Sequence, residues 1–204
     1  MTIWDRFYRD SVIGILTPGA YVIDVGGSLR ATPGRGNRYD PQNAYLTPYV
    51  EKAQYKILDP VPDFSPDIVG DIHNLSLSDN SVDAFLCIAV LEHIEDPRRA
   101  MREMLRVIRP GGKVFLYVPF LFYYHAEMGY YKDFWRYTKD SLPLLAEGYA
   151  DAKWQSVRGA TETWLHLSPL GRIPGIPTIA RLIDRLSGKV NSNQVSGYFG
   201  LLTK

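Results

Sequence analysis

The sequence has one cysteine, Cys87, so no disulfide can form within the chain. Its amino terminus lacks the basic-then-apolar order of a signal peptide. No apolar run approaches the roughly 18 residues that a membrane-spanning helix needs. We therefore expect a cytoplasmic protein in a reducing environment, with no transmembrane segment.

The sequence also lacks an excess of either charge. Lys plus Arg number 23 and Asp plus Glu number 22, for a net charge of +1, so we expect no nucleic-acid partner. One basic cluster exists, but the same stretch carries apolar residues at helical spacing, which makes its arginines the solvated face of a helix. The cluster is Arg98, Arg99, Arg102, Arg106 and Arg109. With 46% apolar and 22% charged residues, the composition is that of a globular protein.

Two signatures of functional sites are missing. No set of histidines, cysteines and carboxylates has the sequence spacing typical of metal ligands, so the sequence predicts no metal. A Gly-x-Gly-x-x-Gly dinucleotide fingerprint starting at Gly26 would need glycines where Ser28 and Ala31 stand. This excludes a nicotinamide oxidoreductase of the usual kind.

Strand and helix patterns alternate along the first two thirds of the chain, which predicts βαβ crossovers and a parallel sheet. The expected strands are residues 20–25, 54–58, 67–70, 82–88, 113–118, 153–160 and 195–202. Helices are expected over 97–108 and 138–147, and a short one carries Ile179, Leu182, Ile183 and Leu186 before Gly188. We find no repeat and no linker, so we expect a single domain over residues 1–204, with variable segments at 119–138 and 166–188.

Polar residues and glycines follow the first four strands, where ligands bind in open α/β sheets. Gly26-Gly27 permits close approach of the backbone to a ligand, and Asp24 is placed to order that turn. Asp59 suits a ribose diol, and Asp71 suits an adenine amino group. After the fourth strand, the carbonyls of Ile88 and Ala89 can meet an ammonium group. Each feature alone is also typical of an ordinary turn or helix cap, and the combination favours a nucleoside ligand.

Residues 20–119 resemble class I S-adenosylmethionine-dependent methyltransferases, in the group related to ubiquinone-biosynthesis enzymes. The resemblance rests on residues 71–83 (DIHNLSLSDNSVD), on Leu91-Glu92-His93-Ile94, and on Arg109-Pro110-Gly111-Gly112. It implies a Rossmann-like α/β fold: a seven-stranded, mostly parallel sheet with helices on both faces and the last strand antiparallel. The implied cofactor is S-adenosylmethionine, with S-adenosylhomocysteine as product. The implied cofactor residues are Asp24, Gly26, Gly27, Asp59, Pro60, Asp71, Ile72, Ile88, Ala89 and His93. For His93, a purely structural role is an equal alternative.

The glycine loop departs from that family. The family's usual Asp-x-Gly-x-Gly-x-Gly is replaced by Asp24-Val25-Gly26-Gly27-Ser28-Leu29-Arg30. The stretch from 31 to 49, with Pro33, Gly34, Gly36, Pro41 and Pro48, does not have the pattern of the usual first helix. We therefore expect a remodelled cofactor loop.

Residues 119–138 follow the fifth strand and are expected to cover the acceptor. Pro119-Phe120, His125 and residues 133–138 (DFWRYT) are similar to a subgroup found in bacterial glycan and polysaccharide biosynthesis clusters. A hydroxyl acceptor benefits from a base, and His125 is the first candidate, with Glu127 second. Tyr123, Tyr124, Tyr130 and Tyr131 are candidates for acceptor contact, although aromatic residues here are also typical of a loop closing over a core. Asp133 and Arg136 either contact the acceptor or pair with each other to hold the loop.

Three functions are consistent with these residues. The first is O-methylation of a small molecule or glycan hydroxyl. The second is a C- or N-methyltransferase on the same scaffold, and the third is a non-catalytic S-adenosylmethionine-binding protein. For residues 166–188 we expect packing on the sheet or against a second copy of the chain, with contact to a lipid carrier or membrane surface as the alternative.

Overall fold

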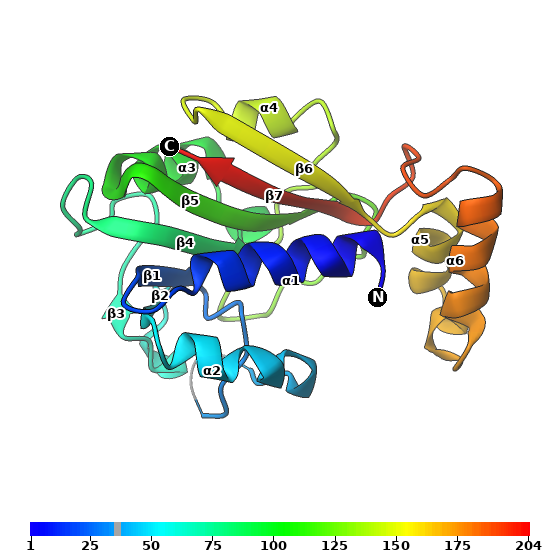
Figure 1. The fold of residues 1–204 in the computed structure, drawn as a ribbon, viewed down its shortest axis with the longest axis horizontal. Helices are drawn as coiled ribbons and strands as arrows, with labels where there is room; N and C mark the ends of the chain where they lie inside the picture. Colours follow the sequence, from blue (N-terminus) through cyan, green and yellow to red (C-terminus); the bar gives the residue numbers. More distant parts are fainter. Residues whose placement is uncertain (35–37) are drawn as a thin grey trace.

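A seven-stranded sheet runs through the computed structural model, which describes residues 1–34 and 38–204 (Figure 1). The strand order is β3-β2-β1-β4-β5-β7-β6. β1 to β5 are parallel, and β7 runs antiparallel to both β5 and β6. This confirms the predicted fold class. The strands are β1 (Tyr21–Val25), β2 (Gln54–Asp59), β3 (Ile68–Val69), β4 (Val82–Ile88), β5 (Ile108–Pro119), β6 (Asp151–Val157) and β7 (Gly197–Thr203).

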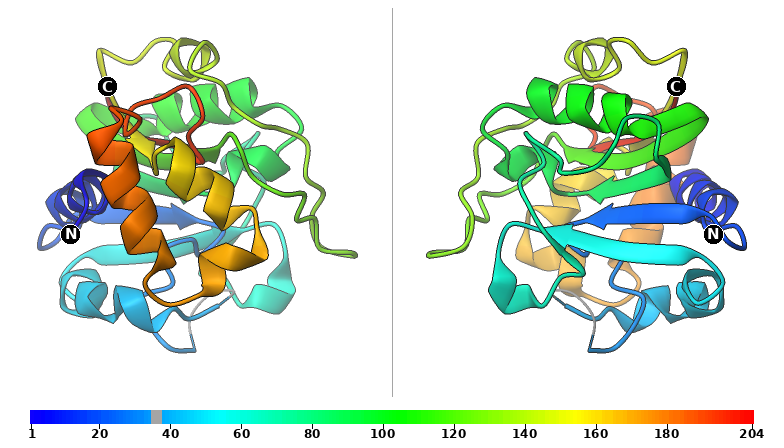
Figure 2. Two further views of the ribbon diagram at one scale, coloured as in Figure 1. Left: turned by 90° about the vertical axis from the view of Figure 1, so that its right-hand side faces the viewer. Right: turned by 90° about the vertical axis from the view of Figure 1, so that its left-hand side faces the viewer.

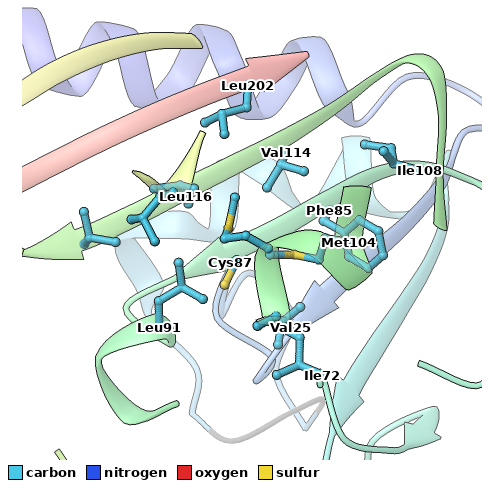
Figure 3. Close-up of a cluster of buried hydrophobic side chains, with 14 of the residues drawn as sticks. Val25, Ile72, Phe85, Cys87, Leu91, Met104, Ile108, Val114, Leu116 and Leu202 are labelled. Carbon is cyan, nitrogen blue, oxygen red and sulfur yellow. The ribbon is translucent and has the colours of Figure 1, made fainter. Parts of the chain in front are cut away.

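Helices cover both faces of the sheet and enclose two apolar cores (Figures 1 and 2). α1 packs Val12 and Ile15 on one face of the sheet, together with its C-cap residue Leu16. α3 packs Met101 and Met104 on the other face, in the cluster drawn in Figure 3. The helices are α1 (Ile3–Ile15), α2 (Thr47–Val50), α3 (Pro97–Val107), α4 (Leu142–Leu145), α5 (Ala160–His166) and α6 (Ile176–Leu186). The 3₁₀ turns are η1 (Pro41–Leu46), η2 (Pro62–Phe64), η3 (Leu91–His93) and η4 (Pro169–Arg172).

Most of the predicted elements are present, and the departures have local causes. The helix expected over 138–147 is only the single turn α4, because Pro143 lacks an N–H and fits only the first turn of a helix. The sixth strand ends at Val157, since Arg158 adopts a left-handed conformation and α5 begins at Ala160. α1 and α5 were not expected, although Thr2 and Asp5 form a capping box at the start of α1.

The segment from 31 to 49 differs from a regular first helix, as expected. Its described part consists of the 3₁₀ turn η1 followed by the single turn α2. Gly36, one of the glycines singled out there, lies outside the described residues. The described part of the segment is therefore irregular chain followed by two short turns, in place of a regular helix.

Gly112 in β5 is expected to tolerate no side chain. A Cβ there would lie 2.7 Å from the Asp83 backbone oxygen and 2.9 Å from the Arg109 backbone oxygen, neither of which can rotate away. We expect Gly112→Ala to lower the free energy of unfolding by about 1–3 kcal/mol, measured by urea denaturation. Gly14→Ala is the matched control: this exposed α1 position has nothing within 4 Å, so stability should stay equal or rise by at most about 1 kcal/mol. Equal stability of the two variants would contradict the prediction.

α5 and α6 form a helical hairpin beyond the end of the sheet (Figure 1). Asp184 of α6 is buried and accepts hydrogen bonds from the backbone N–H groups of Thr161 and Glu162, at 2.8 and 3.1 Å. Arg181 pairs with Glu162 at 2.8 Å.

The apolar stripe of α6, in contrast, faces outward: Ile179, Leu182, Ile183 and Leu186 are 46–81% exposed. Of the two expected arrangements, packing on the sheet is therefore wrong, and packing against a second copy of the chain stays a prediction. Over residues 1–34 and 38–204, no helix has both the length and the apolarity to span a bilayer.

Candidate functional site

A cavity of about 520 Å³ opens at the carboxyl ends of β1, β2 and β4. The sheet order reverses between β1 and β4, which is the switch point where open α/β sheets bind ligands. Eleven of the residues predicted from the sequence line the cavity: Gly26, Asp59, Pro60, Asp71, Ile72, Ile88, Ala89, His93, His125, Tyr130 and Tyr131. A hollow of about 470 Å³ at the opposite edge is less suited to a ligand, because its charged pair, Asp83 and Arg109, is already joined at 2.6 Å.

Asp24 orders the loop after β1. Its side chain is fully buried and accepts hydrogen bonds from the backbone N–H groups of Ser28 and Leu29, at 3.0 and 2.9 Å, and from the Ser28 hydroxyl at 2.5 Å. The Tyr55 hydroxyl donates a further bond from β2. Burial raises the pKa of Asp24, and these hydrogen bonds oppose the rise. Asp24 thus lies behind the cavity wall and shapes it.

The loops after β1 and β4 contain backbone positions with left-handed conformations. Gly26 and Gly27 have φ values of 72° and 57°, which glycine adopts without strain. A Cβ on Gly26 would lie 3.2 Å from Cγ2 of Val90, so the loop packs closely on the segment after β4. Ala89 also has a positive φ, 55°, which is strained for a residue with a side chain. Its N–H donates to the Tyr117 carbonyl at 3.1 Å, which holds it in place.

The acidic residues after β2 and β3 differ in their surroundings. Asp59 is buried, one of its oxygens accepts the Val61 N–H at 2.8 Å, and burial raises its pKa. The Asp71 side chain is 63% exposed, and one of its oxygens is 2.7 Å from Nδ1 of His73. Ile72, also in the lining, is buried and supplies an apolar surface. The lining thus contains a buried carboxylate, an exposed carboxylate and an apolar surface.

Residues 119–138 fold back over the cavity from the end of β5. Asp133 and Arg136 form a bidentate pair, with N–O distances of 2.6 and 2.7 Å, and the Asp133 side chain is only 1% exposed. Arg136 lowers the pKa of Asp133 to about 2. Arg136 also donates to the Phe122 and Tyr123 carbonyls. Asp133 and Arg136 therefore pair with each other and hold the loop, which is the second of the two roles considered for them.

His125 is held between two carboxylates. Its backbone N–H donates to Asp133 at 2.8 Å, and its Nδ1 lies 3.2 Å from Asp133 and 3.1 Å from the Tyr123 carbonyl oxygen. Its Nε2 lies 3.7 Å from Oε1 of Glu92. The Glu92 carboxylate raises the pKa of His125 above its usual value, against the effect of partial burial. The His125 ring lies edge-on to that of His93, with centroids 4.8 Å apart.

Of Glu127 and the four candidate tyrosines, only two tyrosines line the cavity. Glu127 lies outside the cavity lining, pairs with Arg38 at 2.6 Å and accepts the Tyr131 hydroxyl at 2.9 Å. Tyr131 and Tyr130 face the cavity, the latter against Phe64 with ring centroids 5.1 Å apart. Tyr123 and Tyr124 are 56% and 74% exposed and do not line it. Asp24, Gly27, Asp133 and Arg136 also lie outside the lining.

The structure adds residues that the sequence did not indicate. Arg30, Phe64, Lys132 and Phe134 line the cavity, and Arg30 has a positive φ of 54°. Glu92 lies behind His93 with its side chain only 1% exposed. The glutamate was part of the Leu91-Glu92-His93-Ile94 motif, so a signal existed for it. Arg30 ends the loop that the sequence marked as remodelled, but no pattern assigned its side chain to the site.

Glu92, His93 and His125 each offer one ligand atom, and these atoms lie within 4.8 Å of one another. The sequence predicted no metal because these residues do not have the short spacing of familiar metal motifs. The fold of residues 119–138 over η3 brings them together.

Comparison with known proteins finds similarity over the middle of the chain. Residues 45–116 match the family described as a methyltransferase domain. A demethylmenaquinone methyltransferase of Renibacterium salmoninarum is 33% identical over 115 residues, which cover 54% of this chain and 45% of that protein. The first four curated relatives are matched over only 15–45% of their own length.

Solved structures extend the fold likeness to nearly the whole chain. An S-adenosylmethionine-dependent methyltransferase of Archaeoglobus fulgidus has a TM-score of 0.60 at 15% identity, covering 98% of this chain and 92% of that one. The [4+2]-cyclase SpnF has a TM-score of 0.52 at 17% identity, covering 98% of this chain and 81% of that one. At these identities the likeness establishes the fold, and that fold hosts more than one chemistry.

Proposed function

We propose that this chain, which carries a methyltransferase domain over residues 45–116 within the fold of S-adenosylmethionine-dependent methyltransferases, is itself such an enzyme. The observation that carries the proposal is the cavity at the switch point. It is lined by residues that follow four consecutive strands, in the order that a nucleoside with an amino-acid tail requires. S-adenosylmethionine would supply the electrophilic methyl group when bound.

The cavity wall supports an assignment of residues to parts of the cofactor. Asp59 accepts hydrogen bonds from the ribose diol, and Asp71 with Ile72 holds the adenine. Gly26 and Ala89, which have left-handed conformations and line the cavity, lie against the methionine part. Arg30, also in the lining, supplies a cation for the carboxylate. Pro60, Ile88 and His93 complete the wall, while Asp24 and Gly27 shape the loop behind it.

We propose a hydroxyl acceptor, on a small molecule or glycan, covered by residues 119–138. Methyl transfer forms a bond from the acceptor oxygen to the methyl carbon, breaks the carbon–sulfur bond, and releases the hydroxyl proton. His125 reaches the cavity from that segment and is the candidate to activate the hydroxyl. Tyr130 and Tyr131 offer aromatic surface to the acceptor, whereas Glu127, already in an ion pair with Arg38, is second to His125.

Calorimetric titration with S-adenosylmethionine and S-adenosylhomocysteine tests the cofactor site. We expect micromolar affinity for the wild type and at least a tenfold loss in Asp59→Ala, because a buried hydrogen-bonding carboxylate is removed. Asp63→Ala, two residues past Val61 and outside the lining, is the matched control and should keep the wild-type affinity. Failure of the wild type to bind either compound would overturn the proposal.

Two other functions on this scaffold are distinguished by turnover. A C- or N-methyltransferase would transfer the methyl group without depending on His125. A non-catalytic binding protein, for which the altered glycine loop is the supporting observation, would bind S-adenosylhomocysteine but methylate no acceptor. A screen of sugars, glycolipids, phenols and amines with radiolabelled cofactor separates these cases.

The exposed stripe of α6 supports a proposed contact with an anionic membrane surface. The exposed Arg185 and Lys189 lie beside it, while the nearby carboxylates of Glu162 and Asp184 are buried. We expect the chain to float with phosphatidylserine-containing vesicles and Leu182→Asp/Leu186→Asp to lose most of that binding. Thr178→Asp is a control that adds a negative charge on the same helix. A stable dimer that binds no vesicle would contradict this contact and assign the stripe to a second copy.

A further inference from the structure

We propose that Glu92, His93 and His125 form a binding site for one divalent first-row transition-metal ion at the wall of the cavity. The three ligand atoms lie within 4.8 Å of one another, and two of the residues line the cavity. Metal–ligand bonds of about 2.0–2.2 Å require only a small contraction of this cluster. Glu92 and His93 come from η3, and His125 comes from residues 119–138. The site therefore links the cofactor side of the cavity to the segment that folds over it.

Hydrogen bonds at Nδ1 orient both imidazole rings for metal binding through Nε2. Nδ1 of His93 lies 2.6 Å from the Lys132 carbonyl oxygen, and Nδ1 of His125 lies 3.1 Å from the Tyr123 carbonyl oxygen. A carbonyl oxygen can only accept, so in each ring Nδ1 carries the hydrogen and Nε2 presents its lone pair. Asp133, 3.2 Å from Nδ1 of His125, adds the carboxylate–histidine arrangement that is common behind metal ligands.

The surroundings of the Glu92 carboxylate point independently to a cation site. Its side chain is 1% exposed, and within the described part of the chain neither carboxylate oxygen has a hydrogen-bond partner. The nearest cationic group, Nε2 of His125 at 3.7 Å, is beyond hydrogen-bonding distance. A buried carboxylate left this way is destabilising, whereas a metal ion would satisfy it.

Backbone hydrogen bonds hold Glu92 in place, and this limits where its carboxylate can lie. Its carbonyl oxygen accepts the N–H groups of Phe134 and Trp135, at 2.8 and 3.2 Å. These bonds attach residues 119–138 to η3 beside the proposed ligands. The position of His125 relative to Glu92 and His93 is therefore set by backbone contacts on both sides.

The donor set indicates the class of metal. Two imidazole nitrogens and one carboxylate oxygen suit Zn²⁺, Mn²⁺, Fe²⁺ or Co²⁺, whereas Ca²⁺ and Mg²⁺ prefer oxygen ligands. Three protein ligands leave coordination positions open toward the cavity. If the proposed function holds, an acceptor hydroxyl could take one of these positions, where the ion would make it more acidic so that its proton passes to water. The metal would then take over the activation otherwise assigned to His125 as a base.

Titration of the tag-free, chelator-treated full chain with Co²⁺ tests the site directly. We expect one equivalent to bind and produce visible absorption bands, and Zn²⁺ to displace it. Glu92→Gln and His93→Ala should each weaken binding at least tenfold, measured by the same titration. His166→Ala, a histidine outside the cluster, is the matched control and should bind Co²⁺ as the wild type does.

Far-UV circular dichroism and titration with S-adenosylhomocysteine on each variant show whether it folds and binds cofactor. If Glu92→Gln does not fold, His93→Ala carries the test. Absence of stoichiometric Co²⁺, Zn²⁺ and Mn²⁺ binding in the folded wild type would overturn the metal site. Because cofactor binding is measured separately, that result would leave the proposed function standing. Metal binding that is unchanged in both folded variants would also overturn it.

Discussion

Replacing His125 by alanine is expected to lower the rate of methyl transfer about 100-fold or more. His125 is the one histidine that residues 119–138 bring to the cavity, and its ring is fixed by Asp133 and the Tyr123 carbonyl. Whether its Nε2 accepts a proton or binds a metal ion, alanine removes the activating group. Single-turnover rates with radiolabelled cofactor and an accepted substrate measure the effect.

Affinity for S-adenosylhomocysteine should change only a few-fold in the same variant. The proposed cofactor contacts come from the ends of β1 to β4, and His125 comes from the segment after β5. His166→Ala controls for loss of an imidazole in a neighbouring segment, because its ring packs on Phe122 with centroids 5.6 Å apart. A His125→Ala enzyme that retains most of its rate would contradict hydroxyl activation and favour a C- or N-methyltransferase.

Asp24→Ala is expected to lower the free energy of unfolding by about 3 kcal/mol or more. The substitution removes the acceptor for hydrogen bonds from Ser28, Leu29 and Tyr55, and the loss of a buried hydrogen bond costs about 1–3 kcal/mol. The turn that places Gly26 should loosen as well, so affinity for S-adenosylhomocysteine should fall at least tenfold. Urea denaturation and calorimetry measure the two effects.

Tyr55→Phe is the control for this prediction, because it should have a smaller effect on stability. It removes a single donor to Asp24 and keeps the aromatic ring, so we expect a loss of about 1–2 kcal/mol and little change in affinity. If Asp24→Ala were no less stable than Tyr55→Phe, Asp24 would not be what holds the loop.

The sequence by itself determined the sheet and the cofactor half of the site. Apolar strands such as Val82–Ile88 are local patterns, and the residues that follow strands must meet at one edge of a parallel sheet. Strand order and spacing were therefore enough to place Asp59, Asp71 and Gly26 together. The short α4 shows the limit of local patterns, since Pro143 outweighed an otherwise helical stretch.

Only the tertiary structure decided the acceptor half. His125 meets Glu92 and His93 because the Asp133–Arg136 pair and the backbone bonds to Glu92 fold residues 119–138 over η3. Such an arrangement has no sequence periodicity, so spacing rules predicted no metal where three ligand atoms converge. The exposure of the α6 stripe was equally undetermined, because an apolar helix face has the same pattern whether it lies against a sheet, a partner or a membrane.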